Sequence, residues 1–291
     1  MTVTPPQVQP PSQGAVRALL AGTAPRAASF IVTIYGDVVE PRGGTLAMAT
    51  LIDTCARHGI SESLVRTAVS RLVGAGRLVG ERIGRRSFYR LSDPARAEFR
   101  QASRIIFAPP PQPQGWLVAL VQAGASAPPG WVTLGPNVMI TPQGDGAAPL
   151  PAGAVMAAQG IAGLDALPGV AAQHWPLAEV ARSYRAFADR FARHAAHGLA
   201  EVLPDEDALA LRLRLIDEYR HAALADPRLP RDALGPDWPG DRARDIFRRI
   251  YLDLSPGADR FVGRNFADAT GLLPQATPET ERRAAVMRAG P

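Results

Sequence analysis

The sequence has no lysine, a single cysteine and no long apolar run. All 32 basic residues are arginines, and with the many alanines, glycines and prolines this indicates GC-rich coding rather than special chemistry. One cysteine, Cys55, excludes an internal disulfide framework. No apolar stretch approaches the ~18–20 residues that span a membrane. Residues 1–14 lack the basic and apolar parts of a signal peptide. We therefore expect a cytoplasmic protein that does not enter a membrane.

Positive charge is concentrated in one segment. Residues 26–104 hold 13 arginines and seven acidic residues, a net charge of +6, whereas the residues after 104 hold 18 arginines and 20 acidic residues. This asymmetry is typical of a nucleic-acid-binding module, because neutralisation of phosphates supplies most of the affinity of such a module.

Composition divides the chain into five parts. Residues 1–25 predict a disordered or loose tail, since they are rich in Pro and Gln. Residues 26–107 have dense apolar periodicity and predict a compact domain, which the Pro-rich run 109–113 ends. Residues 115–175 predict a small α/β domain, 176–270 a helical domain, and the polar residues 271–291 a frayed tail. Short apolar runs in the α/β part predict strands at 116–121, 137–141 and 154–158.

Two short helices are expected between Thr45 and Gly76. Thr45 is placed to cap a helix that runs to His58, and Gly59 breaks it. Ser61 is placed to cap the second helix, with Ile60 and Val65 at the positions of a hydrophobic staple. Two helices joined by a tight glycine-containing turn form a helix-turn-helix, whose second helix enters the major groove of DNA.

The second helix is predicted to have an apolar and a polar face. The apolar positions are Leu64, Val65, Ala68, Val69, Leu72 and Val73. The polar positions are Ser63, Arg66, Thr67, Ser70 and Arg71. Because Arg pairs with guanine edges and Ser or Thr reaches bases and phosphates, these polar residues are the candidate groove contacts.

A basic hairpin is expected directly after this helix. Residues 78–91 alternate apolar and polar on both sides of Gly84-Arg85, which predicts a turn. Arg85 and Arg86 lie at the tip and Arg82 on one arm, as in a wing that contacts the DNA backbone or minor groove. From the pattern alone, a winged-helix adaptor that binds protein instead of DNA stays open as an alternative.

Three blocks of this segment resemble the PaaX family of repressors of phenylacetic acid degradation operons. They are Ser29–Thr45, Gly59–Ala68 and Arg82–Leu91. The β-branched run 30–39 by itself predicts a strand, whereas the resemblance implies the first helix of the domain. Farther along, Asp226–Pro230, Asp237–Gly240 and Ala243–Tyr251 are similar to the family's C-terminal helical domain.

The resemblance implies an α+β protein with an N-terminal winged helix-turn-helix, a small ferredoxin-like middle domain and a helical C-terminal domain. Here the middle part is short, rich in Ala and Gly, and poor in charge. The expected partners are double-stranded operator DNA, an aryl- or acyl-CoA effector such as phenylacetyl-CoA, and a second copy of the chain in a homodimer. No cofactor and no enzymatic activity are expected.

An acyl-CoA effector needs arginines for its phosphates and an apolar slot for its acyl group. One C-terminal segment combines these residue types and supplies the candidate effector contacts Trp238, Arg244, Phe247, Arg248 and Tyr251. A helix packed by its aromatic residues, with arginines outside, is the alternative interpretation.

Other constellations predict little. His194 and His197 have helical spacing but no third metal ligand nearby. A metal-dependent nuclease would need acidic residues after its first strand, yet Val121 is followed by Gln-Ala-Gly-Ala-Ser. Neither a metal site nor catalytic residues are therefore expected. Cys55 is expected to be a small core residue, with a redox role left open.

Overall fold

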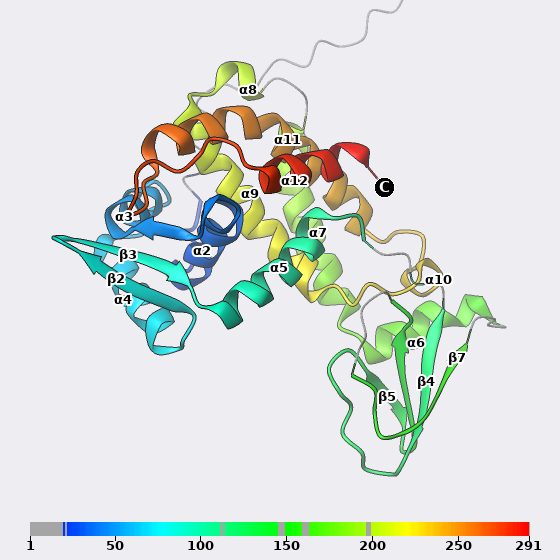
Figure 1. Cartoon of the computed structure of the whole chain (residues 1–291). Helices are drawn as coiled ribbons and strands as arrows, with labels where there is room; N and C mark the ends of the chain where they lie inside the picture. Colours follow the sequence, from blue (N-terminus) through cyan, green and yellow to red (C-terminus); the bar gives the residue numbers. More distant parts are fainter. Residues whose placement is uncertain are drawn as a thin grey trace, which may run out of the picture. The chain divides into compact units, whose positions relative to one another are not determined.

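The computed structural model describes residues 20, 22–110, 113, 115–144, 149–158, 163–195 and 199–290. The chain forms two compact units (Figure 1). The first unit combines the chain up to Ala108 with residues 187–221 and 242–290, and the second combines residues 109–186 with 222–241. The five-part division expected from composition stays a prediction, and the predicted linker run 109–113 lies only partly within the described residues.

The first unit begins with a helix that changes its winding. Helix α2 (Ala27–Ile34) continues as a π-helical segment (Tyr35–Val39) and a 3-10 turn (Glu40–Arg42). The strand that the β-branched run 30–39 predicts is therefore wrong, and the helix implied by the family resemblance is confirmed. Phe30, Ile31, Ile34 and Val38 are fully buried, so burial of one helical face outweighs the weak strand preference of β-branched residues.

The remaining N-terminal elements build a helix-turn-helix and a three-stranded sheet. They are β1 (Thr45–Ala47), α3 (Met48–Ala56), α4 (Glu62–Gly74), β2 (Leu78–Ile83), β3 (Arg86–Leu91) and α5 (Asp93–Phe107). The sheet order is β1-β3-β2, and both pairs are antiparallel. Thr45 pairs with Arg90 in this sheet, so the prediction that Thr45 caps a helix is wrong; α3 starts three residues later.

Helices of 4 to 26 residues follow in the second half of the chain. They are α7 (Leu177–Phe191), α8 (Leu199–Val202), α9 (Asp205–Ala225), α11 (Gly240–Asn265) and α12 (Pro278–Ala289), with a 3-10 turn at Ala192–His194. One apolar core in the first unit joins N-terminal residues such as Phe30 and Leu51 to Leu213, Val262 and Phe266. The helix-turn-helix therefore folds on the C-terminal helices rather than around a core of its own.

The expected polar tail contains a packed helix. Thr277 caps α12 through a reciprocal pair of hydrogen bonds with Thr280. Arg283 and Met287 are buried. The prediction of a frayed tail is therefore wrong. It rests on the lack of apolar periodicity, whereas this helix is held in part by a buried arginine, Arg283, which pairs with Asp37.

The second unit contains a four-stranded antiparallel sheet. Its strands are β4 (Trp116–Val121), β5 (Val132–Gly135), β6 (Val138–Pro142) and β7 (Gly153–Ala158), in the order β5-β6-β4-β7. Three strands fall where the apolar runs predict them, and β5 is an additional one. The helices of this unit include α6 (Leu167–His174), which follows a 3-10 turn at Leu164–Ala166, and α10 (Arg231–Leu234).

The two faces of this sheet are covered differently. Trp116 packs with Trp175 and Ala233, so α6 and α10 lie on one face. Ala119 and Met139 pack with Trp131 on the other face, from the connection between β4 and β5. A ferredoxin-like domain has a helix between its first two strands and another between its last two. Within the described parts of those two connections there is no helix here, which accounts for the shortness of the segment.

Two absences hold for the described residues. None of the helices placed there is both long and apolar enough to cross a membrane. Those same parts of the chain contain no group of three or more His, Cys, Asp or Glu side chains that could hold a metal ion. His197 lies outside the described residues.

Candidate nucleic-acid interface

The turn between α3 and α4 is closed by backbone and apolar contacts. Gly59, with φ of 75°, donates its N–H to the carbonyl of Ala56, and Ile60 donates to the carbonyl of Cys55. Ile60 and Val65 are both buried, as a hydrophobic staple requires. Ser61 is the N-cap residue, but its side chain makes no capping hydrogen bond. Glycine geometry and apolar packing therefore fix the angle at which α4 leaves the turn.

Helix α4 presents the predicted polar residues to solvent. Val65, Ala68 and Val69 are buried. All five predicted groove contacts of this helix are exposed, namely Ser63, Arg66, Thr67, Ser70 and Arg71. The side chain of Arg71 has no ion-pair partner in the described part of the chain. This row has the composition needed for contacts with base edges and phosphates.

Arg66 differs from Arg71 in having a carboxylate partner. Its Nη2 lies 2.7 Å from Oε1 of Glu62, one helical turn earlier, and its Nε lies 2.8 Å from the same oxygen. Both side chains are more than half exposed. The pair occupies one guanidinium edge and places a negative charge beside the exposed polar row of α4. Any contact of Arg66 with DNA must therefore compete with Glu62.

The apolar face of α4 is narrower than predicted. Leu64 is 56% exposed and Val73 is 39% exposed, so the expectation that both belong to the buried face is wrong. Leu64 adjoins Ser63 in the first turn of the helix, on the polar side. An exposed leucine at this place has the chemistry for contact with a thymine methyl group.

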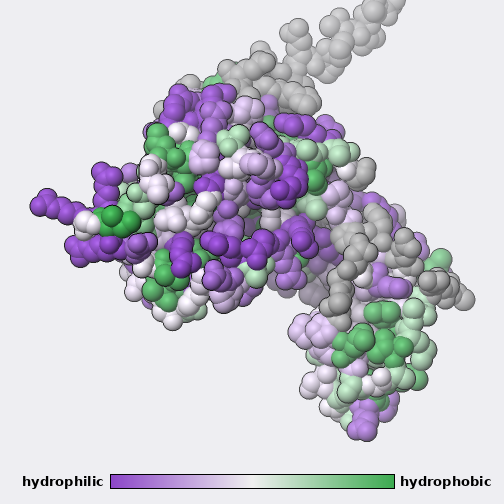
Figure 2. Space-filling model, viewed as in Figure 1, coloured by the Kyte–Doolittle hydropathy of each residue, from purple (hydrophilic) through white to green (hydrophobic). Residues whose placement is uncertain are grey.

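The predicted hairpin is present with the predicted turn. Ile83 pairs with Arg86, which leaves Gly84 and Arg85 as a two-residue loop. Gly84 has φ of 61°, as the first position of a hairpin turn of type II′ requires. The tip is hydrophilic on the surface (Figure 2), and Arg82, Arg85 and Arg86 are all exposed there. The wing therefore exposes arginines within the same compact unit as α4.

The base of the wing is fixed to the first helix. The hydroxyl of Tyr35 donates to the carbonyl of Tyr89 at 2.9 Å. Phe88 and Leu91 are buried. In contrast, every residue of β2 after Leu78 is exposed, including the apolar Val79 and Ile83. One strand of the hairpin is therefore anchored while the other is free to face a ligand.

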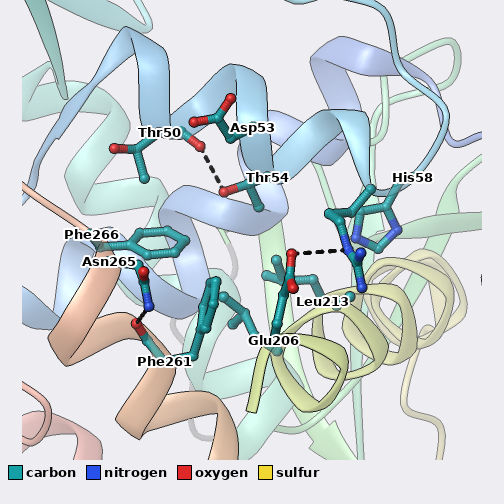
Figure 3. Close-up of a pocket in the computed structure, with 12 residues that line it drawn as sticks. Thr50, Asp53, Thr54, His58, Glu206, Leu213, Phe261, Asn265 and Phe266 are labelled. Atoms are coloured by element: carbon teal, nitrogen blue, oxygen red, sulfur yellow. Dashed lines mark hydrogen bonds and ion pairs between the residues drawn. The ribbon is translucent and has the colours of Figure 1, made fainter. Parts of the chain in front are cut away.

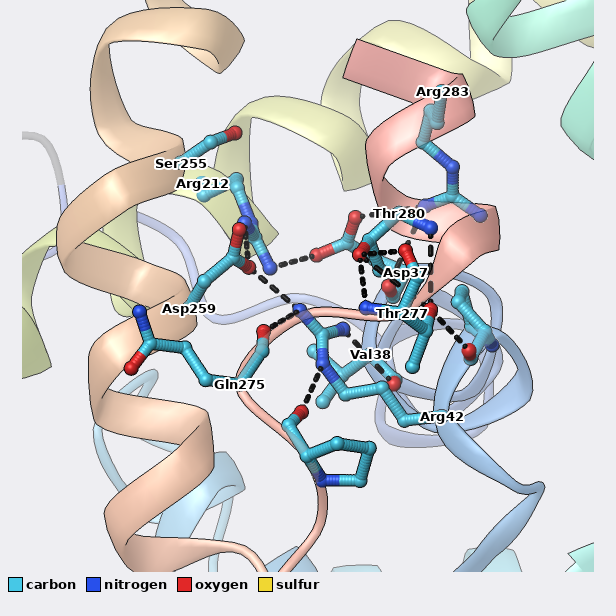
Figure 4. A network of polar contacts seen from close by, with 12 residues as sticks. Asp37, Val38, Arg42, Arg212, Ser255, Asp259, Gln275, Thr277, Thr280 and Arg283 are labelled. Carbon is cyan, nitrogen blue, oxygen red and sulfur yellow. Dashed lines mark hydrogen bonds and ion pairs between the residues drawn. The ribbon is translucent and has the colours of Figure 1, made fainter.

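A buried ionic network holds the first helix on the C-terminal helices (Figure 4). Asp37, in the π-helical segment, lies 2.9 Å from Nη2 of Arg212 and 3.1 Å from Nη1 of Arg283, and it accepts from the hydroxyl of Tyr251 at 3.0 Å. Asp259 bridges Arg212 and Arg42 at 2.8 and 2.7 Å.

The network contains one more arginine than carboxylates. Burial lowers the pKa of Arg212, but Asp37, Tyr251 and Asp259 together raise it further than burial lowers it. Burial and the neighbouring Arg212 lower the pKa of Arg42. Removal of either carboxylate would leave guanidinium groups without partners in an apolar environment, which is strongly unfavourable.

A small cavity of about 190 Å³ lies beside α3. Thr50 and Thr54 of α3 face it on one side, and Leu213 of α9 and Phe261 of α11 on the other (Figure 3). His58 lines it and is 2% exposed, and neither ring nitrogen has a hydrogen-bond partner within the described parts of the chain. Burial, together with the cations Arg214 and Arg57, lowers the pKa of His58 to about 3. His58 is therefore neutral at physiological pH.

Cys55 is a core residue. It is fully buried, and burial raises the pKa of its thiol to about 12. Because the thiolate is the reactive form, this side chain is inert at neutral pH.

The five residues predicted to contact the effector do not all belong to one compact unit. Trp238 lies in the second unit, and the other four lie in the first. Phe247 stacks on Tyr219 with ring centroids 4.1 Å apart. The hydroxyl of Tyr251 is engaged by Asp37. Arg244 is buried, and Arg248 pairs with Asp245 at 3.2 Å. An effector role for these residues stays a prediction.

Known proteins resemble this chain in sequence. The family described as PaaX-like protein matches residues 26–95, and its C-terminal domain matches residues 175–264. The transcriptional repressor PaaX of Escherichia coli (strain K12) is 32% identical over 274 residues, covering 84% of this chain and 86% of that protein. An uncharacterized protein of Mycobacterium tuberculosis, of known structure, is 23% identical, with a TM-score of 0.44; the match covers 73% of this chain and 89% of that one.

Proposed function

Because this chain belongs to the PaaX family, we propose that it is a DNA-binding regulator that represses transcription. The observation that supports the proposal best is the combination, in one compact unit, of an exposed Ser/Thr/Arg row on α4 and an arginine-tipped hairpin. The helix would read the major groove, while the wing would contact the backbone or the minor groove.

The target of repression in this proposal is an operon for the breakdown of an aromatic acid of the phenylacetate type. An aryl- or acyl-CoA, with phenylacetyl-CoA as first candidate, would release the protein from DNA. To do so, the thioester must bind the DNA-incompetent state more tightly than the competent one. A homodimer would place two recognition helices on symmetry-related half-sites and so increase specificity.

The test is a fluorescence anisotropy titration of the purified protein on its own promoter fragment, with and without phenylacetyl-CoA. Tight, sequence-specific binding that the thioester abolishes is the expected result. Tight binding that the thioester does not change would support the repressor function and reject phenylacetyl-CoA as the effector. Binding that is absent, or that does not fall steeply as salt rises, would reject DNA reading in favour of a protein-binding adaptor.

Arg66→Ala sharpens the assignment of α4. If Arg66 reads a base, the substitution costs roughly 1–3 kcal/mol on the operator and much less on random DNA. Equal weakening on both DNAs, measured in the same titration, would assign Arg66 to a phosphate contact. Arg249→Ala, which removes an exposed arginine of α11 outside α4 and the wing, is the matched control for loss of an arginine side chain.

A further inference from the structure

A larger cavity of the first unit, about 500 Å³, is lined by α5 and α12. The π-helical segment and the turn after it contribute Gly36, Glu40 and Pro41 to its wall. Sites for small molecules in proteins range from roughly 300 to 1,000 Å³. The cavity is therefore of the size expected for a ligand, unlike the smaller one beside α3.

Helix α5 turns a mixed face toward this cavity. The lining residues are Phe99, Arg100, Ser103, Arg104 and Phe107. Their spacing places them on one side of the helix. Arg100 and Arg104 are exposed at the opening, whereas Phe107 is buried. This face thus combines two cations at the solvent edge with an aromatic ring inside.

Helix α12 presents a similar face from the other side. Its lining residues are Glu279, Arg282, Arg283 and Val286. Arg282 pairs with Glu279 at 2.8 Å, and Glu40 pairs with Arg96 at 3.1 Å. The carboxylates of the cavity are therefore already neutralised, and within the described residues no ion pair involves Arg104. The cavity holds four arginines and two glutamates, an excess of positive charge that favours an anion.

Arg283 links this cavity to the buried network. Its guanidinium lies 4.0 Å from the ring centroid of Phe107, and Nη2 donates to the carbonyl of Gly36 at 3.2 Å. Its Nη1 lies 3.1 Å from Asp37. Nε of Arg283 is buried and has no hydrogen-bond partner among the residues that the structure describes. A buried donor without an acceptor is unfavourable, and an acceptor on a ligand would satisfy it.

We propose that this cavity is the regulatory site of the protein, and that it binds a ligand with clustered negative charge, such as phosphate, joined to an apolar or aromatic end. Charged groups of the ligand would lie against Arg100 and Arg104, and its apolar end against Phe99 and Phe107. The inference rests on the proposed function only in taking this ligand to be the effector that controls DNA binding.

The position of the cavity explains how a bound ligand affects the wing and α4. Only Ser92 separates the end of wing strand β3 at Leu91 from the start of α5 at Asp93, so a displacement of α5 is transmitted to the wing. On the opposite wall, an anion that attracts Arg283 competes with Asp37 for this arginine. Because Asp37 lies in the π-helical continuation of α2, loss of the pair loosens the hold on the first helix. Either shift favours a state in which wing and α4 no longer match the DNA.

The experiment is isothermal titration calorimetry with phenylacetyl-CoA and with coenzyme A alone, on the full chain. Arg104→Ala removes an exposed charge at the opening, and Ser103→Phe fills the cavity from the same helix. We expect each to weaken phenylacetyl-CoA binding by about tenfold or more, since loss of a charge-assisted contact has this effect. Arg249→Ala, an exposed arginine on α11 outside the cavity, is expected to bind like the wild type.

The outcomes separate this inference from the proposed function. Wild-type affinity in both cavity variants, each with an unchanged unfolding midpoint, would overturn the cavity assignment even if the thioester still releases operator DNA. So would the absence of binding heat with the wild type. If Arg104→Ala binds the operator more weakly than the wild type in the absence of ligand, Arg104 contacts DNA. That result would also overturn the cavity assignment. If the wild type does not bind the operator at all, the proposed function is rejected. The calorimetry would then still show whether the cavity binds the ligand.

Discussion

The exposed arginines of α4 and the wing differ in their surroundings from the buried arginines of the network around Asp37. Arg71, Arg85 and Arg86 are exposed, and no ion pair involves them in the described part of the chain. Arg212 and Arg283 are almost fully buried, and both share Asp37. The first group is free to exchange water for phosphate at small cost. The second group has fixed partners and holds the first helix on the C-terminal helices.

This difference teaches that the positive charge of a DNA-binding unit has two separate uses. An arginine that binds DNA must be available, which makes its contribution to folding small. An arginine in the core needs a carboxylate partner, which makes loss of that partner costly. A chain without lysine uses the same side chain for both, so only burial and partners distinguish the roles.

Asp37→Asn should have the largest effect, on the buried side of the comparison. It leaves Arg212 and Arg283 without their shared carboxylate, and breaking a buried pair costs about 3–5 kcal/mol of unfolding free energy. Urea unfolding followed by circular dichroism measures this loss. Asp245→Asn, which removes an exposed partner of Arg248 and Arg249, is the control and should change stability little. Similar stabilities for the two variants would contradict the network's role.

His58 tests burial of a titratable side chain that has no carboxylate partner among the described residues. Its pKa is about 3 in the folded protein against 6.5 for the free side chain, so the unfolded state binds the proton more readily. Stability is therefore complete above pH 6.5 and is lost as pH falls toward 3, with about 2 kcal/mol lost at pH 5. In His58→Leu, this part of the acid sensitivity should disappear from thermal unfolding. Parallel losses in variant and wild type would reject the assignment.

The double variant Arg85→Ala/Arg86→Ala tests the exposed side. If both side chains contact phosphates, the slope of log affinity against log salt falls by about 2, and affinity at low salt falls about tenfold. Operator and random DNA should be affected alike. Folding stability should stay unchanged, in contrast to Asp37→Asn. An unchanged salt slope would remove the wing from the DNA interface.

Glu62→Gln should have the smallest effect, and in the opposite direction. It frees Arg66 from an exposed ion pair and removes a negative charge beside the reading surface. Because such pairs contribute roughly 0.2–1 kcal/mol, DNA affinity should rise by about 1.4- to fivefold. The anisotropy titration measures this gain. A loss of affinity confined to the operator would instead show that Glu62 itself accepts a hydrogen bond from a base.

Features encoded by neighbouring residues could be predicted from the sequence. The turn at Gly59, the staple of Ile60 and Val65, and the hairpin loop Gly84-Arg85 depend on contacts within a few positions. The run 30–39 is ambiguous locally, because the same β-branched residues suit a strand or a fully buried helix. Its helix followed only from resemblance to a family.

Long-range contacts could not be predicted. Nothing around Asp37 indicates that Arg283, 246 positions later, is its partner. Nothing in the polar sequence of α12 indicates a buried anchor. For the same reason, the sequence does not indicate that residues of α5 and α12 line one cavity.

The pairing of Asp37 with Arg283 also has a consequence for biosynthesis. At about 5–20 residues per second, the ribosome completes Arg283 roughly 12–50 seconds after Asp37. Until then, the apolar face of the first helix and the charge of Asp37 lack their C-terminal partners. Domains that are continuous in sequence fold as soon as they emerge, whereas this unit cannot complete its buried network until Arg283 has been synthesised. A copy that ends before α12 lacks the partner that Arg283 gives to Asp37, and we expect it to be less stable than a copy that contains this helix.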